Sequence, residues 1–176
     1  MGKGMMIANF LLLLIVVTGC SSSMNGISEI DGKLQKYVPL KNVPVINNLS
    51  IKEVWIKHGM DNQHGDMNTI VITYANINGE FKKEKLNPSE DVTLLYGPYE
   101  GDKVFTLSVT ELEVDYDDQL ETKLWKGIEL SFTEIGDYLI LLARHNNLSY
   151  SSEGRITSTS SIEQQFDWFT QAIQSN

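Results

Sequence analysis

Hydrophobic and polar residues alternate along most of the middle of the chain, which is the pattern of half-buried β-strands. Alternation or enrichment in β-branched residues marks 50–58, 68–77, 80–88, 91–97, 103–116 and 123–136. Residues 137–145 form a continuous apolar run, which is typical of a buried central strand. The sequence therefore predicts a mostly antiparallel sheet of about six or seven strands.

The segments 68–77 and 80–88 are separated only by Asn78 and Gly79. Asn-Gly is the strongest short hairpin signal, because both central residues of the turn adopt positive φ. We therefore predict that these two segments pair with each other. The polar, serine-rich stretch 146–159 is predicted to be a loop.

The chain ends show helical spacing instead. A single apolar stripe along the C-terminal segment is formed by Ile162, Phe166, Phe169 and Ile173. Ser160 with Glu163 three residues later is a capping box that begins this helix. Residues 27–40 carry a shorter helical pattern, which Pro39 ends. The predicted fold is α+β, with the C-terminal amphipathic helix packed on one face of the sheet.

The first twenty residues have the pattern of a secretory signal. Lys3 is followed by an apolar run over 5–18, which is shorter than the about twenty residues of a membrane-spanning helix. The run ends in Val17-Thr18-Gly19-Cys20, which resembles the lipobox of bacterial lipoproteins. The resemblance implies that the Cys20 thiol is joined to diacylglycerol and that a peptidase cuts between Gly19 and Cys20. Two alternatives are a buried cysteine and a retained membrane helix.

This interpretation divides the chain into three parts. Residues 1–19 are the lipoprotein signal peptide, 20–26 are the lipidated cysteine and a flexible tether, and 27–176 are a single α+β domain. The protein is then expected at the cell membrane, held by its N-terminal lipid and facing away from the cytoplasm. Cys20 is the only cysteine, so its lipidation leaves the domain without a disulfide or a thiol nucleophile.

Composition supports a soluble domain and excludes one class of partner. The chain is 41% hydrophobic and 21% charged, as is usual for a domain with its own core, and its formal net charge is −9. Nucleic-acid binding needs clustered Lys and Arg, so we expect no nucleic-acid partner. The acidity also argues against attraction to anionic lipid, so membrane contact is expected through the acyl chains alone.

Two acidic segments offer oxygen or imidazole ligands for a metal. Asp115, Asp117 and Asp118 lie in a predicted turn, where a weak calcium site is an alternative to an ordinary solvated turn. The segment from Asp61 to Asp66 includes His64, but its turn-like sequence favours a solvated connector. We predict no metal and no cofactor.

Aromatic residues give the remaining candidates. Tyr96 and Tyr99 lie in a glycine-containing segment that lacks the spacing of a phosphate-binding loop, so a surface turn is expected. Trp55, Trp125 and Trp168 are expected to fill the core, with a ligand groove as the alternative. Because no convergent set of catalytic groups is found, we predict that the protein is not an enzyme.

The body of the chain resembles a domain of unknown function found in lipoproteins and anti-sigma-like membrane proteins of Gram-positive bacteria. The matching segments are "TIVITYANINGE", "KLWKGIELSFTEIGDYLILLA" and "SSIEQQFDWFTQAI". This resemblance brings no catalytic residues with it.

Two functions therefore remain. In the first, the protein is a non-enzymatic binding or accessory domain whose sheet face or edge strand contacts a protein, a peptide or a cell-wall component. In the second, it carries an apolar ligand between the sheet and the terminal helix. The carrier requires a cavity of about 300 Å³ or more beneath that helix.

Lipidation at Cys20 can be tested directly by substitution. We expect the full chain to incorporate a radiolabelled fatty acid in cells, and Cys20→Ala to lose both the label and the cleavage. Ser21→Ala is the matched control and should be labelled normally. Normal labelling of Cys20→Ala would overturn the lipobox interpretation.

Overall fold

The computed structural model describes residues 22–61, 65–76, 91–113 and 120–176. Several sequence predictions fall outside these residues. They concern the signal peptide with Gly19 and Cys20, His64, the Asn78-Gly79 turn, the segment 80–88, and the acidic cluster of Asp115, Asp117 and Asp118.

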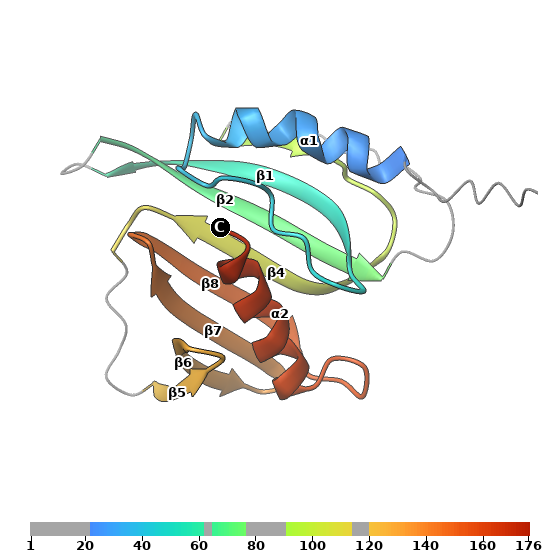
Figure 1. Cartoon of the computed structure of the whole chain (residues 1–176), viewed down its shortest axis with the longest axis vertical. Coiled ribbons are helices and arrows are strands. Elements are labelled where there is room, and N and C mark those ends of the chain that lie inside the picture. The colour runs from blue at the N-terminus through green and yellow to red at the C-terminus, as the bar shows by residue number, and fades with distance from the viewer. Residues whose placement is uncertain (1–21, 62–64, 77–90, 114–119) are drawn as a thin grey trace, which may run out of the picture.

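Eight strands form one sheet in the order β3-β1-β2-β4-β8-β7-β6-β5, and every neighbouring pair is antiparallel (Figure 1). The strands are β1 (Ser50–Asp61), β2 (Gly65–Asn76), β3 (Val92–Tyr96), β4 (Asp102–Thr110), β5 (Glu121–Trp125), β6 (Ile128–Ile135), β7 (Tyr138–His145) and β8 (Leu148–Arg155). The α+β class is confirmed, and the sheet has one strand more than the upper end of the prediction.

Two helices and a connector cover one face of the sheet. Helix α1 (Ser22–Leu34) lies along β1 and β3, and α2 (Ile162–Gln174) lies across β7 and β8 (Figure 1). The connector 35–49 runs between α1 and β1, and we call it the strap. Helices, strap and sheet share one hydrophobic core, in which the strap buries Val38, Leu40, Val43 and Ile46. The predicted C-terminal helix packed on one face of the sheet is therefore confirmed.

Alternation along the strands separates the two faces, as β4 illustrates. Phe105, Leu107 and Val109 are fully buried beneath the helices. Thr106 and Ser108 are half-buried on the opposite face, which neither helix covers. Because side chains alternate with a period of two, the register of each strand decides which residues this uncovered face presents. We call it the open face.

Aromatic packing fixes α2 on the sheet. Phe166 and Phe169 are 1% and 0% exposed. The Phe166 ring lies 5.3 Å from that of Phe132 and 5.4 Å from that of Trp125, measured between centroids. Burying such side chains contributes about 1.5–3 kcal/mol each. The space between helix and sheet is thus filled by aromatic side chains.

The strap is fastened to α2 by hydrogen bonds. The Asn47 amide donates to Gln171 Oε1 at 3.2 Å, and the Asn42 amide donates to Asn176 Oδ1 at 3.1 Å. Beneath it, the buried Tyr74 hydroxyl donates to the Pro44 carbonyl at 2.8 Å. Segments from both ends of the chain therefore cover the same face together.

Helix boundaries differ from those predicted. Helix α1 begins at Ser22, within the segment 20–26 assigned to a tether, and it ends at Leu34 rather than near residue 40. Turns replace the helix after Leu34, and the amides of Tyr37 and Val38 both donate to the Leu34 carbonyl there. Helix α2 is capped by Ser161 and Gln164, one residue later than the predicted box.

The capping box moves because Ser160 has another role. It pairs with Thr157 in an isolated bridge, and it is 3% exposed. Ser161 then accepts a hydrogen bond from the Gln164 amide, and Gln164 Oε1 accepts one from the Ser161 amide.

The largest correction concerns the stretch 146–159, which is not a loop. It contains β8, a central strand between β4 and β7. Asn146 and Asn147, both with positive φ, form the turn, and Leu148 and Tyr150 then enter the core. The sequence does not indicate this strand, because serine is polar. The serines of β8 are buried by the strands on either side and not by their own hydrophobicity.

One further prediction about strands was wrong. The segment 123–136 is two strands, because Lys126 and Gly127 adopt positive φ and form a hairpin turn between β5 and β6. Strand β2 pairs with β1 and β4, and the segment 80–88 that was predicted to pair with 68–77 lies outside the described residues. Within the described residues, no helix is both long and apolar enough to cross a membrane.

Close packing at Gly154 predicts a strong effect of adding one methyl group. A Cβ at Gly154 would lie 2.3 Å from Gln165 Oε1. Gln165 is fully buried, and its Nε2 donates to the Arg155 and Ser160 carbonyls, so it cannot move freely. We expect Gly154→Ala to lower the free energy of unfolding by about 1–3 kcal/mol in urea titrations.

The matched control is Gly32→Ala in α1, where nothing lies within 4 Å of the added Cβ. It should raise the free energy of unfolding by up to about 1 kcal/mol, because alanine favours helix. Equal stability of wild type and Gly154→Ala would contradict the packing described for Gln165.

Candidate binding groove on the open face of the sheet

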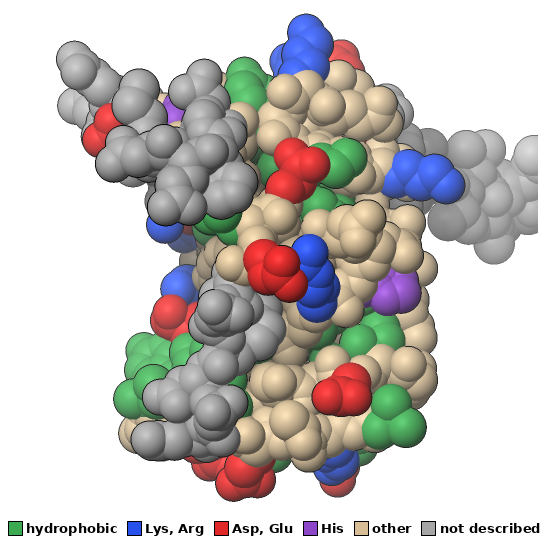
Figure 2. Space-filling view, turned by 90° about the vertical axis from the view of Figure 1, so that its left-hand side faces the viewer, with side chains coloured by type: hydrophobic (Ala, Val, Ile, Leu, Met, Phe, Trp, Pro, Cys, Tyr) green, Lys and Arg blue, Asp and Glu red, His purple; other side chains and the backbone are tan. Residues whose placement is uncertain are grey.

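A groove of about 770 Å³ crosses the open face. Its walls come mainly from the central strands, and we call it the open-face groove. It is lined by Glu53, Trp55, Lys57, Val71, Thr73, Val92, Lys103, Thr106, Ser108, Ile140, Ser151, Ser152 and Glu153. Figure 2 shows a side view in which acidic and basic side chains lie next to each other at the left, with hydrophobic side chains gathered below them.

Strand register arranges the lining residues in two rows across the sheet. In the first row, Glu53 on β1, Thr73 on β2, Thr106 on β4 and Glu153 on β8 are consecutive partners. The second row is formed in the same order by Trp55, Val71, Ser108 and Ser151. Neighbouring strands lie about 4.8 Å apart, so each row presents closely spaced groups.

The two rows differ in chemistry. The first has a carboxylate at each end and two hydroxyls between them. The second begins with the half-buried Trp55 beside Val71, which is 9% exposed, and ends in two serines. An aromatic platform therefore lies next to a line of hydrogen-bonding groups.

Charges in the groove balance. Glu53 and Glu153 face Lys57 and Lys103, and the Lys103 ammonium lies 3.7 Å from a Glu153 carboxylate oxygen. Both side chains of this pair are about half exposed, so solvent screens their attraction. The groove thus lacks the acidic excess of the whole chain, whose formal charge is −9.

One hydroxyl of the first row has no partner. Thr106 Oγ1 is buried, and no hydrogen bond to it is formed. Leaving a buried hydroxyl unsatisfied costs about 1–3 kcal/mol. The centre of the groove therefore retains a polar group that does not stabilise the fold.

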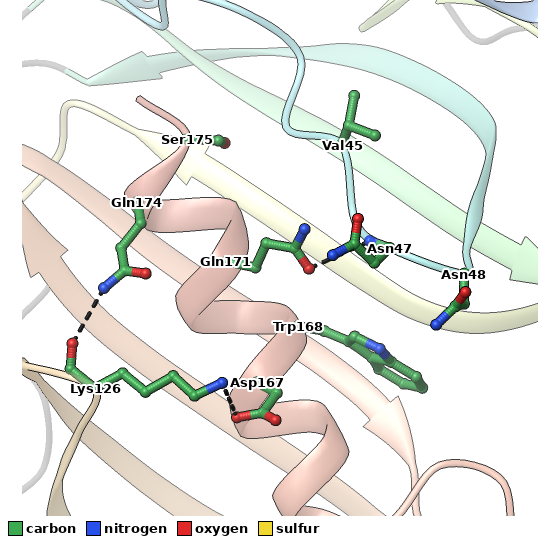
Figure 3. Close-up of a pocket in the computed structure, with 9 residues that line it drawn as sticks. All are labelled: Val45, Asn47, Asn48, Lys126, Asp167, Trp168, Gln171, Gln174 and Ser175. Atoms are coloured by element: carbon green, nitrogen blue, oxygen red, sulfur yellow. Dashed lines mark hydrogen bonds and ion pairs between the residues drawn. The ribbon is translucent and has the colours of Figure 1, made fainter.

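A second groove, of about 590 Å³, lies beside α2 rather than beneath it (Figure 3). Val45, Asn47 and Asn48 of the strap line one side. On the other side α2 contributes Asp167, Trp168, Gln171 and Gln174. The structure thus places Trp168 at a groove and against the edge of Phe105, 6.0 Å away between ring centroids.

Polar contacts close the lower end of this second groove. The Lys126 ammonium lies 2.7 Å from Asp167 Oδ1, to which Trp125 Nε1 also donates at 2.8 Å (Figure 3 shows the ion pair). The hydrogen bond from Lys126, with a smaller contribution from Trp125, lowers the pKa of Asp167. This carboxylate therefore stabilises the fold above its ordinary pKa, and the contribution is lost as the pH falls through the lowered value. These groups serve to fasten α2.

His58, Tyr96 and Tyr99 do not line the open-face groove. His58 Nδ1 is 2.9 Å from Asn68 Oδ1, and Nε2 is 2.8 Å from Thr93 Oγ1, so both ring nitrogens are engaged. The Tyr96 and Tyr99 rings lie 5.1 Å apart between centroids, and burial followed by the influence of Tyr99 raises the pKa of Tyr96 to about 12. Within the described ranges, no three His, Cys, Asp or Glu side chains are grouped to hold a metal.

The sequence indicated one residue of the open-face groove as a candidate but not the residues that lie beside it. Trp55 was a candidate, whereas Ser108 and Ser151 were not. Their positions become meaningful only when β8 is recognised as the neighbour of β4. The signal was available in the alternation of Leu148 and Tyr150 with Ser149 and Ser151.

Comparisons with protein-family models, with curated proteins and with solved structures found no match to this chain.

The unpartnered hydroxyl in the groove yields a stability prediction. Thr106→Val keeps the shape of the side chain and removes the buried oxygen. We expect the free energy of unfolding to rise by about 1 kcal/mol, measured by urea titration with fluorescence detection.

Thr170→Val is the matched control. The Thr170 hydroxyl is also buried but donates to the Phe166 carbonyl at 2.8 Å. Its loss should cost about 1 kcal/mol. If both variants lose stability equally, Thr106 Oγ1 has a partner and the description of the groove is incorrect.

Proposed function

We propose that this protein is a lipid-anchored binding domain on the outer face of a cell membrane, and that it holds a partner in its open-face groove without catalysing a reaction. The anchor is supported by Val17-Thr18-Gly19-Cys20, whose order resembles a lipobox. The resemblance of the rest of the chain to a domain of lipoproteins agrees with a location at the membrane.

The observation that carries the binding proposal is the contrast between the two sheet faces. One face is covered by α1, α2 and the strap, which together bury a continuous core. The other retains a hollow of about 770 Å³ lined by an aromatic side chain, hydroxyls and charges of both signs. A concave surface that combines apolar and polar groups is the usual form of a ligand site.

The side chains that line the groove can form hydrogen bonds with a bound partner. Ser108 on β4 and Ser151 on β8 are cross-strand partners, and charged side chains of both signs lie on the same lining. Such groups can form several hydrogen bonds with an extended partner. In this proposal the rigid sheet positions the groups, and the lipid confines the domain to the membrane surface.

The carrier alternative has less support. Its ligand was expected between the sheet and α2, where Phe166, Phe169 and Ile173 are at most 1% exposed. The groove of about 590 Å³ near α2 lies beside the helix and is lined mostly by polar side chains.

Photo-crosslinking in intact cells tests the binding proposal. A photoreactive phenylalanine at Ser108, inside the groove, should form a discrete adduct with a cell-surface molecule. Adding Trp55→Ala should abolish this adduct, because it removes the aromatic platform. The same photoreactive residue at Glu163, which is exposed on α2, is the matched control and should not form it. An adduct that forms from both positions, or that persists without Trp55, would refute the groove as the binding site.

A further inference from the structure

We infer that the open-face groove binds a neutral saccharide chain rather than an ionic ligand or an isolated sugar. This inference rests on the proposed function and names its ligand class. Three observations carry it: the balance of charge in the groove, the aromatic platform beside hydroxyls, and the length of the two rows.

Charge complementarity favours a neutral ligand. Two carboxylates and two ammonium groups line the groove, and one of each is already paired across β4 and β8. An anionic ligand would meet Glu53 and Glu153, and a cationic one would meet Lys57 and Lys103. A neutral polyol instead accepts hydrogen bonds from the ammonium groups and donates its own to the carboxylates.

The platform suits the ring of a sugar. One face of a pyranose consists largely of C–H groups, whereas its rim carries hydroxyls. Trp55 beside Val71 offers an apolar surface for that face, as aromatic side chains do in ligand sites. Glu53 lies two positions from Trp55 along β1 and lines the same groove, so its carboxylate is placed beside the indole for the hydroxyls of such a ring.

The rows are longer than one ring. Lining residues come from β3, β1, β2, β4, β8 and β7, which are consecutive in the sheet. Six strands at about 4.8 Å spacing extend over about 24 Å. Ser108, Ser151 and Glu153 continue the hydrogen-bonding groups away from Trp55 along this direction. A chain of linked rings fits this extent, whereas a single sugar engages only one part.

Titration calorimetry of the full chain in detergent tests the inference. The probes are chitotriose, cellotriose and maltotriose, together with glucose and N-acetylglucosamine. We expect saturable binding of at least one trisaccharide, with an affinity at least about tenfold above that of the single sugars. A tenfold rise in salt should leave this binding unchanged, since the ligand is neutral.

Variants locate the site. Trp55→Ala should weaken binding of that trisaccharide by about tenfold or more, and Glu53→Gln should also weaken it. Trp168→Ala is the matched control, because Trp168 is half-buried in the other groove, and it should bind as wild type. Circular dichroism of each variant shows whether it is folded, and Glu53→Gln preserves the shape of its side chain.

The results separate this inference from the proposed function. Absence of saturable binding by all three trisaccharides overturns the saccharide inference. Binding that Trp55→Ala and Glu53→Gln leave unchanged, or that falls steeply with salt, overturns it as well. If a Trp55-dependent adduct nevertheless forms at Ser108 in cells, the groove remains the binding site and the ligand belongs to another class.

Discussion

Packing of α2 against the sheet is the interaction on which the rest of the structure depends. Phe166 and Phe169 fill the space above Phe132 and the neighbouring strands, and they exclude water from the second half of the core. The first half is closed by α1 and the strap, which is tied to α2 through Asn47 and Gln171. Because all three covering segments use one face of the sheet, the opposite face is left to solvent.

This asymmetry explains why the groove has its particular residues. A strand covered on one face alternates apolar residues with residues that tolerate water. Here the outward positions of β1, β2, β4 and β8 hold threonine, serine, glutamate, valine and tryptophan. Val71 is 9% exposed and Trp55 is half-buried, so together they form a small apolar surface among the polar groups. Thr106 Oγ1 is buried on this face without a hydrogen-bond partner, as are Ser160 Oγ and Gln165 Oε1 elsewhere in the described residues.

The sequence revealed those parts of the fold in which a residue's own hydrophobicity decides its position. The stripe of α2 and the alternation of β4 belong to this class, and both were predicted correctly. Strand β8 was missed because Ser149, Ser151 and Ser152 owe their place to β4 and β7 on either side. The turn at Lys126 and Gly127 was missed because apolar residues continue beyond it.

The open-face groove could be predicted only in part for the same reason. Trp55 could be singled out from composition, but a row of hydroxyls exists only after four strands are placed in register. Cross-strand neighbours such as Thr73 and Thr106 are 33 residues apart in the chain, so no local pattern links them. The metal-ligand candidates at Asp115, Asp117 and Asp118 lie outside the described residues and stay predictions.

The central claim is that the helices and strap cover one face of the sheet while the opposite face is open. Thiol accessibility tests it most directly, using Ser108→Cys on the open face and Ala143→Cys beneath the helices, each combined with Cys20→Ala. Ala143 is 3% exposed, whereas Ser108 lines the groove. The account predicts rapid alkylation of the thiol at position 108 and protection of the thiol at position 143 until the protein unfolds. Equal protection at both positions would show that the second face is also covered, and would contradict the account.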